Sequence, residues 1–177
     1  MKICSGVMLA VLATAAVSTA AQAQDVANPV VSSSNEIVVR QSAFIIAAAE
    51  QMPADKYGYR PTPEQWTYGK IIAHVTQANF GVCGMLSGDS AGKGPAVAET
   101  DPKEKLVAVL KQSFDVCKTA MDGLKDASLG GTITYFGGAK KPRARALVEL
   151  TDDLEDHYSQ MASYLRLNSM LPPSAKK

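Results

Sequence analysis

The sequence predicts an all-α protein built as a four-helix bundle, and three observations support this fold class. Four segments repeat apolar residues at alternating spacings of three and four, which is the pattern of a helix with one buried face. Residues that start and stop helices flank these segments. Only one stretch is β-like, and it is too short to start a sheet. Four amphipathic helices without paired strands indicate a four-helix bundle.

The first 23 residues have the pattern of a secretory signal peptide. Lys2 supplies a positive charge at the start, and residues 7–17 form an uncharged apolar run. Ala21-Gln22-Ala23 then places small residues at the two positions that signal peptidase reads. The apolar run is shorter than the roughly 20 residues that a membrane-spanning helix needs. We therefore expect an exported protein, periplasmic or secreted, with no membrane insertion after the signal peptide is removed.

The remaining chain, residues 24–177, has the size of one domain with one core. Without Lys2 it carries seventeen basic and seventeen acidic side chains, which is a formal net charge of zero. The sequence has no basic stripe interleaved with aromatic residues, so we expect no nucleic-acid partner. We expect a flexible lead-in over residues 24–35, the bundle over residues 36–172 and a tail over residues 173–177.

The first helix is expected over residues 36–52. Serines at positions 32–34 stand before it as caps, and Pro53 ends it. Residues 55–66 then form a loop that has two prolines, a glycine and three aromatic residues. Such a loop exposes costly apolar area unless it packs, so we expect it to fold over one end of the bundle. A second interpretation makes the loop the wall of a pocket.

The second helix is expected over residues 67–86, with Thr67 as its N-cap. The glycine-rich stretch 88–94 ends it. This stretch is not a phosphate-binding loop, because it lacks the Gly-Lys-Ser/Thr ending and a preceding strand. The apolar face of this helix is formed by Ile71, Val75, Ala78, Val82 and Leu86.

The third helix begins with a strong start signal at Asp101-Pro102-Lys103-Glu104. The aspartate offers an acceptor at the cap, the proline suits the first turn, and the glutamate closes a capping box. The buried face that the spacing predicts is formed by Val107, Leu110, Phe114, Cys117, Met121 and Leu124.

A connector and a fourth helix complete the predicted fold. Residues 130–138 are β-like but isolated, so we expect a short extended connector before the last helix. Pro142 opens the last helix, and Asn168 with Pro172-Pro173 ends it. The predicted buried face is formed by Leu147, Leu150, Leu154, His157, Met161 and Tyr164.

Two cysteines remain after the signal peptide, Cys83 on the second predicted helix and Cys117 on the third. In an oxidising compartment such a pair forms disulfides readily. A bridge here would stabilise the fold by about 3–4 kcal/mol on the chain-entropy model. The alternative is two buried free thiols, since cysteine packs well as a small apolar side chain. The sequence leaves both alternatives open.

The two histidines and one aspartate form a candidate metal site. His157 falls on the buried face of the last helix, and Asp153 projects from the same face one turn earlier. His74 lies on the second helix beside its apolar stripe. Packed helices are about 8–10 Å apart, so side chains from two of them can meet. Two imidazoles and a carboxylate suit one divalent ion (zinc, nickel, iron or manganese) and leave positions open for water or substrate.

Hydrogen bonding is the alternative interpretation of these residues. A buried neutral histidine beside an aspartate needs no metal, because the carboxylate accepts its proton. Asp153 also belongs to an acidic run with Asp152, Glu155 and Asp156, and most of that run is expected to be a solvated face.

Three parts of the sequence resemble the DinB-like (YfiT-like) family of four-helix proteins, and together they span most of the chain after the signal peptide. The most specific part is Asp156-His157-Tyr158-Ser159-Gln160, followed by Tyr164-Leu165-Arg166-Leu167-Asn168 and Pro172-Pro173. The other two are Met52-Pro53-Ala54-Asp55-Lys56-Tyr57-Gly58-Tyr59-Arg60-Pro61-Thr62-Pro63 and Ile72-Ala73-His74-Val75-Thr76-Gln77-Ala78-Asn79.

The resemblance implies a bundle with an up-down-down-up order of helices. It also implies one divalent metal ion held by three histidines, one on the second helix and two that stand four residues apart on the last. His74 and His157 match two of these ligands, and Asp153 stands where the family has the third histidine. Ser159 is a smaller departure, because glycine is usual at that position. The site is therefore either a mixed one with His74, Asp153 and His157 as ligands, or one that has lost its metal.

The resemblance implies a metal-dependent protein that acts on a small-molecule substrate. Some relatives resemble thiol-dependent transferases or isomerases, in which the metal lowers the pKa of the thiol. Export argues against that use of a thiol, because low-molecular-weight thiols are mainly cytosolic. Two hypotheses follow: a divalent-metal-dependent transferase or hydrolase, and a non-catalytic binding or stress-related bundle. Members of the family often form homodimers, but no exposed apolar face in this sequence is clear enough to predict an interface.

Overall fold

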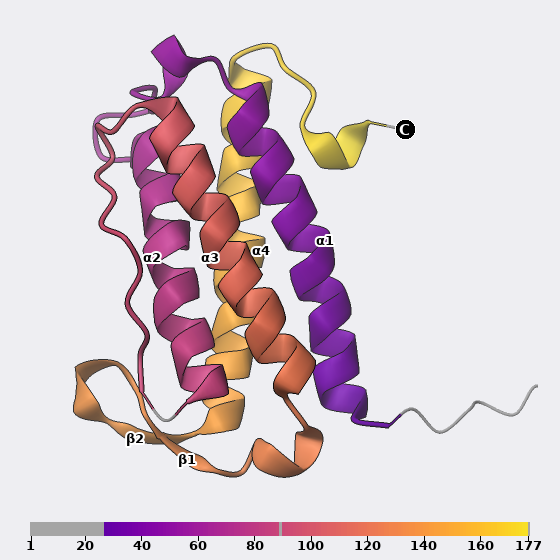
Figure 1. Ribbon diagram of the computed structural model, residues 1–177. Coiled ribbons are helices and arrows are strands. Elements are labelled where there is room, and N and C mark those ends of the chain that lie inside the picture. Colours follow the sequence, from indigo (N-terminus) through magenta and orange to yellow (C-terminus); the bar gives the residue numbers. More distant parts are fainter. Residues whose placement is uncertain (1–26, 89, 177) are drawn as a thin grey trace, which may run out of the picture.

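Four long helices form the body of the molecule in the computed structural model, which describes residues 27–88 and 90–176. They lie side by side as a bundle (Figure 1). The expected signal peptide, residues 1–23, lies outside the described residues. None of the helices within the described ranges is long and apolar enough to cross a membrane. The four helices are α1 (Pro29–Gln51), α2 (Tyr68–Ser87), α3 (Lys103–Gly123) and α4 (Arg143–Leu167).

The helices follow the order up, down, down, up, which confirms the order expected from the resemblance. α1 and α4 run in one direction, and α2 and α3 run in the other (Figure 1). α2 packs against both α3 and α4, and α1 packs against α4 and α3. Because α2 and α3 are parallel neighbours, the chain between them must run back along the length of the bundle. For helices of this length the distance to be spanned is about 30 Å. Residues 90–102 do this as an extended segment beside α2 (Figure 1), called the returning segment below.

Glycines let the returning segment lie directly on α2. A Cβ atom at Gly84 of α2 would overlap the backbone nitrogen of Gly92, and one at Gly94 would overlap the ring of Phe80. The amide of Gly92 also donates a hydrogen bond to the carbonyl of Gly81 at 3.3 Å. The glycine-rich stretch is therefore needed for a close contact between two backbone segments.

α1 begins at Pro29, so the flexible lead-in expected over residues 24–35 is wrong from that residue on. A proline suits the first helical turn, because the N–H that it lacks has no partner within the helix there. The carboxylate of Asp126 accepts hydrogen bonds from the amides of Val30 (3.0 Å) and Val31 (2.9 Å). This cap comes from a distant part of the chain, so no local pattern indicates it.

The other three helices begin and end close to the predicted positions. Thr67 caps α2 as predicted, and its hydroxyl accepts a hydrogen bond from the amide of Lys70 at 3.1 Å. The capping box expected for α3 does not form. The N-cap residue is Pro102, and it makes no side-chain hydrogen bond to the helix. The carboxylate of Asp101 accepts a hydrogen bond from the amide of Ala98 instead, at 2.8 Å.

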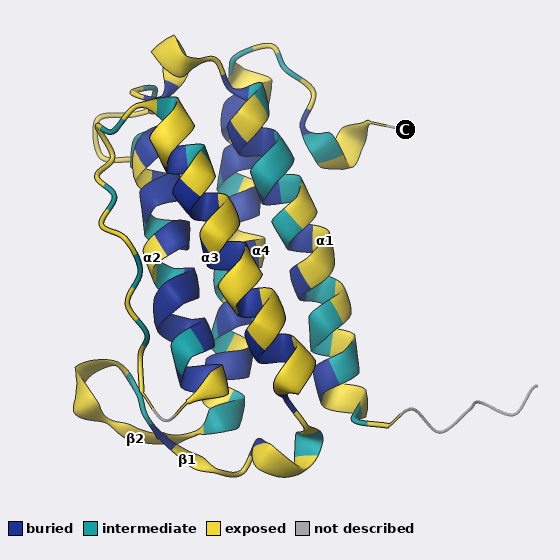
Figure 2. Ribbon diagram, viewed as in Figure 1, coloured by how far each residue is buried: buried dark blue, intermediate teal, exposed yellow. Residues whose placement is uncertain are grey.

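The core lies where the buried faces of the four helices meet (Figure 2). The residues predicted for the buried face of α4 are all buried, and so are those of α3 except Val107, which is partly buried. In α2 the exception is Ala78. The aromatic loop folds over one end of the bundle as predicted, and the hydroxyl of Tyr57 donates a hydrogen bond to the carbonyl of Ala49 at 2.7 Å.

The expected extended connector is instead a small β ribbon. β1 (Thr132–Thr134) pairs antiparallel with β2 (Lys140–Pro142), and the ribbon lies at the end of the bundle where α2 and α3 finish (Figure 1). The side chain of Ile133 is buried and anchors the ribbon to the core. The stretch does not start a larger sheet, as predicted, but its partner strand has no β-like pattern from which to predict the pairing.

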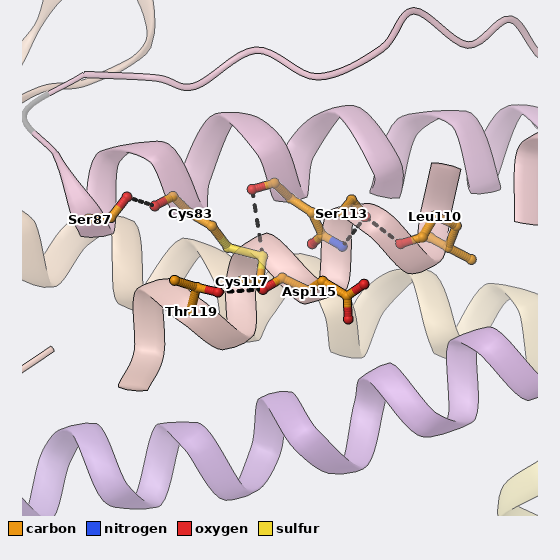
Figure 3. Close-up of a disulfide and its surroundings, with 8 residues drawn as sticks. Cys83, Ser87, Leu110, Ser113, Asp115, Cys117 and Thr119 are labelled. Atoms are coloured by element: carbon orange, nitrogen blue, oxygen red, sulfur yellow. Dashed lines mark hydrogen bonds between the residues drawn. A yellow bond between two sulfur atoms is a disulfide. The ribbon is translucent and has the colours of Figure 1, made fainter. Parts of the chain in front are cut away.

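Cys83 of α2 and Cys117 of α3 form a disulfide inside the bundle (Figure 3). Their Cα atoms are 5.0 Å apart, and both side chains are fully buried. In the same region the side-chain amide of Asn79 donates a hydrogen bond to the hydroxyl of Ser113 at 3.0 Å. Of the two alternatives that the sequence left open, the structure has the bridge, which links two parallel helices.

Candidate metal centre

His74, Asp153 and His157 come together between α2 and α4. Asp153 and His157 share one face of α4, and the packing of α2 on α4 brings His74 to the same place. Oδ1 of Asp153 lies 3.2 Å from Nε2 of His74 and 3.4 Å from Nε2 of His157. One potential ligand atom from each of the three residues lies within 4.8 Å of the other two. The structure thus brings together all three residues that the sequence singled out.

The three side chains lie at increasing depth below the surface. Their exposed fractions are 39% for His74, 18% for Asp153 and 7% for His157. Burial alone would raise the pKa of Asp153, but hydrogen bonds and charge interactions with His157 and His74 outweigh it and lower the pKa to about 2. Asp153 is therefore ionised at neutral pH, as a carboxylate ligand of a metal must be.

His157 is subject to opposing effects on its pKa. Burial lowers the pKa of this imidazole. The hydrogen bond to Asp153 and the charge of Asp153 raise the pKa by more than burial lowers it, so the net shift is upward. Asp156 adds a smaller charge effect in the same upward direction. The carboxylate of Asp153 therefore favours the charged form of a histidine that is almost entirely buried.

The two separations between Asp153 and the histidines fit a divalent ion. Ligands at about 2.0–2.2 Å from a tetrahedral zinc ion lie roughly 3.3–3.6 Å from one another. The two distances from Oδ1 of Asp153 to the histidine nitrogens, 3.2 and 3.4 Å, are close to that range. Hydrogen bonds alone also fit these two distances, so the choice between metal and hydrogen bonding rests on another atom.

That atom is Nδ1 of His157, which is buried and has no hydrogen-bond partner among the described residues. If only hydrogen bonds to Asp153 held the cluster, Nδ1 would be a buried polar atom without a partner in the described part of the chain, whether or not it carries a proton, and this is costly. A metal on Nε2 places the proton on Nδ1, and metal-bound histidines usually donate this proton to an acceptor. Oδ2 of Asp156 lies 3.9 Å from Nδ1 and is the nearby carboxylate for that role. The residues present therefore fit a metal ion.

Trp66 lies against both histidines. The centre of its ring is 5.0 Å from that of His74 and 5.7 Å from that of His157, on which it is stacked with 18° between the planes. The carbonyl of Trp66 accepts a hydrogen bond from the hydroxyl of Tyr164 at 2.9 Å, which ties the loop to α4. Both interpretations of the aromatic loop therefore hold, since it packs over the bundle end and its Trp66 forms a wall of the site.

An open groove of about 360 Å³ begins at His74 and follows one face of α2. Lys70, His74 and Gln77 line it from α2, where residues three and four apart are neighbours on the surface. Val97 and Glu99 of the returning segment line the other side. Sequence reasoning missed this groove. The sequence shows that Lys70 and His74 are four residues apart on one helix, but no pattern in it predicts the path of the segment that forms the opposite wall.

The rest of the acidic run on α4 is largely solvated, as expected. Glu155 pairs with Arg40 of α1 at 2.8 Å on the surface, and Asp152 and Asp156 are exposed. Ser159, where the resemblance leads one to expect glycine, is exposed as well. Of the run, only Asp153 takes part directly in the cluster with the two histidines.

A family model described as the DinB superfamily matches residues 40–161, a stretch that reaches from α1 to α4 and contains the whole candidate centre. The chain belongs to the DinB superfamily. No curated protein matches this DinB-superfamily sequence.

Solved structures of DinB-like proteins share the fold. A DinB-like protein from Bacillus cereus is similar with a TM-score of 0.65 and 14% identity, over 80% of this chain and 95% of that one. A DinB-like protein from Bacillus subtilis has a TM-score of 0.62 and 18% identity, over 81% and 99% of the two chains. At these identities the likeness shows the fold alone.

A mycothiol-dependent maleylpyruvate isomerase contains a bundle of the same fold as part of a longer chain. Its structure is similar with a TM-score of 0.61 and 13% identity over 74% of the present chain. The present chain spans 60% of the isomerase's length. The shared part is therefore the bundle, and the isomerase has further structure outside it.

Proposed function

We propose that this DinB-superfamily protein is an exported, divalent-metal-dependent enzyme of the transferase or hydrolase type that acts on a small molecule. The observation that carries the proposal is the cluster of His74, Asp153 and His157, in which Nδ1 of His157 is buried without a partner. The donor set suits zinc, nickel, iron or manganese. The isomerase with the same bundle supports the view that the fold can carry an enzyme.

The residues of the chain would each have a separate task at such a centre. His157, the most buried of the three, would hold the ion, and the stacked ring of Trp66 restricts the rotation of this imidazole. Nδ1–H of His157 would donate a hydrogen bond to Asp156 once the two approach more closely than the present 3.9 Å, and Nε2 would then be free to bind metal. A bound divalent ion lowers the pKa of a water or a thiol and so provides a nucleophile at neutral pH. His74 borders the groove, so we place substrate entry on its side.

Water is the nucleophile that we favour. The signal-peptide pattern of residues 1–23 and the buried disulfide between Cys83 and Cys117 both support an oxidising compartment. Low-molecular-weight thiols are mainly cytosolic, so an exported enzyme meets them less often. These features support a hydrolase more than a thiol transferase.

Metal content tests the proposal. The protein without residues 1–23 is treated with a chelator, loaded with zinc, nickel or manganese in turn, and dialysed. We expect about one equivalent of metal in the unaltered protein and a loss of affinity of roughly 10-fold or more in His157→Ala, because a ligand is removed. Glu155→Ala is the matched control, since this residue lies on the same helix and pairs with Arg40 on the surface.

Two results would contradict the proposal in different ways. Unaltered protein that retains none of the three metals would refute the metal centre. It would favour the second candidate, a non-catalytic bundle in which Asp153 accepts hydrogen bonds from both histidines. Metal retained by His157→Ala at unchanged affinity would refute the ligand set but not metal binding itself.

A further inference from the structure

The groove beside His74 has the features of a binding site for an anion. We propose that it binds a small substrate that carries a carboxylate, with the carboxylate at Lys70 and the reacting group at His74. The groove holds about 360 Å³ and is open to solvent along α2, which suits a small molecule. This inference rests on the proposed function, because it takes the metal centre as the reacting end.

Lys70 is a cation that lacks an anionic partner in the described ranges, 27–88 and 90–176. Several cations on the helices are paired at short distance, such as Arg40 with Glu155 and Lys105 with Asp101, both at 2.8 Å, whereas Lys70 lines a groove without such a partner in those ranges. The ammonium of Lys70 lies instead 4.9 Å from the centre of the Trp66 ring. A carboxylate ligand would provide the missing partner.

The position of Lys70 in its helix supports the same conclusion. It lies in the first turn of α2, which contains no acidic residue. The partial positive charge at a helix N-terminus favours anions there and disfavours cations by about 0.3–1 kcal/mol. Lys70 therefore adds a second positive charge where the helix already has one. A bound anion would offset this unfavourable charge interaction with the helix.

The spacing of the groove indicates the shape of the substrate. Lys70 and His74 are one turn apart on α2, about 6 Å along the helix axis. Trp66 lies near both, with its ring centre 4.9 Å from Nζ of Lys70 and 5.0 Å from the centre of the His74 ring. Ala73 and Val97 line the groove as apolar residues. These features fit a carboxylic acid whose reacting group is separated from the carboxylate by a short carbon chain or one aromatic ring.

Glu99 limits the charge of the substrate. It lines the groove, and its carboxylate accepts a hydrogen bond from the hydroxyl of Thr67 at 3.1 Å. The formal charges of a divalent ion, Asp153, Lys70 and Glu99 sum to about +1. A single carboxylate matches this charge, whereas a dianion is repelled by Glu99. The structure therefore favours a monocarboxylate.

Binding of benzoate and of its neutral analogue benzamide tests the inference. Both are titrated by calorimetry into zinc-loaded protein. We expect benzoate to bind at least 10-fold more tightly, because a hydrogen bond to a charged group stabilises binding by about 1.5–3 kcal/mol. Lys70→Gln should weaken benzoate about 10-fold and leave benzamide unchanged, and Lys70→Arg should keep the preference. Lys125→Gln, an exposed lysine at the other end of the bundle, is the control.

The outcomes separate this inference from the proposed function. Equal affinities for benzoate and benzamide would overturn the inference even if one zinc ion is bound. An unchanged benzoate affinity in Lys70→Gln would overturn it too, because benzoate would then bind the zinc without the lysine. If the unaltered protein takes up no zinc, the proposed metal centre fails and this inference fails with it. Thermal unfolding of each variant shows that its fold is intact.

Discussion

Asp153 is the residue on which the candidate centre depends most. Its Oδ1 lies within 3.4 Å of a nitrogen of each histidine, so it is the shared contact of the cluster. It stands where the resemblance to DinB-like proteins leads one to expect histidine. A carboxylate can bind a metal directly, and without a metal it can accept hydrogen bonds from both imidazoles. A histidine at this position would not provide this negative charge.

The pH dependence of stability in the metal-free protein should show this charge interaction. Because the pKa of His157 is raised on folding, the stabilisation it brings is complete below its unfolded pKa of about 6.5 and is lost as the pH rises through the folded value. Because the pKa of Asp153 is lowered to about 2, its contribution is present above about pH 4 and is lost as the pH falls towards 2. The free energy of unfolding should therefore decline as the pH rises above about 6.5, and decline again as the pH falls below about 4.

Chemical denaturation in a chelating buffer measures both declines. Asp153→Asn keeps the shape but removes the charge, so the decline above about pH 6.5 should disappear, because burial then lowers the pKa of His157. At pH 5 this variant should be less stable by about 1–3 kcal/mol, the cost of leaving a buried polar group without its charged partner. A variant with the same pH profile as the unaltered protein would show that Asp153 does not set the pKa of His157.

At the residue scale the sequence predicted which three residues cluster better than it predicted their surroundings. The helical period placed His157 on the buried face, and it is buried. His74 was expected only beside the apolar stripe, and it is the most exposed of the three. The contact of Trp66 with both histidines depends on how a loop folds back. The lack of an anionic partner for Lys70 in the described part of the chain depends on side chains from several elements. Neither follows from the spacing of residues along one helix.

At the scale of elements, local signals predicted the helices well and their ends less well. The cap at Thr67 is local, and it forms as predicted. The start of α1 depends on Asp126, and the pairing of β1 with β2 depends on a partner strand that no pattern marks. Contacts between distant segments therefore decide the features that the sequence did not reveal.

The contact between α2 and the returning segment gives a prediction at this scale. Gly84→Ala should destabilise the fold by more than 1 kcal/mol, because the new Cβ meets the backbone of Gly92 and backbone cannot move aside cheaply. In the absence of that contact, alanine in place of a helical glycine would stabilise by about 0.5–1 kcal/mol. A lower free energy of unfolding in Gly84→Ala would therefore indicate that the contact between Gly84 and Gly92 forms.

Gly123→Ala is the matched control for this measurement. Gly123 is the last residue of α3, and a Cβ atom there meets nothing within 4 Å. Its substitution should be neutral or slightly stabilising. Urea unfolding of the two variants and the unaltered protein gives the comparison. A stabilising effect of Gly84→Ala would mean that the returning segment does not lie on α2.

At the scale of the whole molecule, the order of the helices creates the site. Two parallel neighbours, α2 and α3, require a segment that returns along the bundle, and this segment supplies one wall of the groove beside His74. The same order places α2 between α3 and α4. α2 therefore contributes His74 to the candidate centre with α4 and Cys83 to the disulfide with α3. α2 thus takes part in both the candidate metal centre and the disulfide.

The disulfide should stabilise the whole fold without being needed for the site. It joins residues 34 apart in sequence, and on the chain-entropy model closing such a loop stabilises by about 3–4 kcal/mol. Reduction during unfolding, followed by refolding with a reductant, should lower the free energy of unfolding by this amount. The dependence on urea should become steeper, because the reduced chain exposes more surface when it unfolds. Zinc content should stay the same, because α2 and α4 hold the ligands independently of Cys117.

Both cysteines are fully buried, so the reductant must act on the unfolded chain. Reduced protein that is refolded without reductant, in air, should recover its stability, which separates the bridge from any damage done by unfolding. Mass spectrometry of alkylated protein that has been unfolded but not reduced should find both sulfurs unlabelled. Labelling of Cys83 and Cys117 in that sample would show two free thiols. Loss of zinc together with the bridge would instead show that α3 helps to hold α2 in place for metal binding.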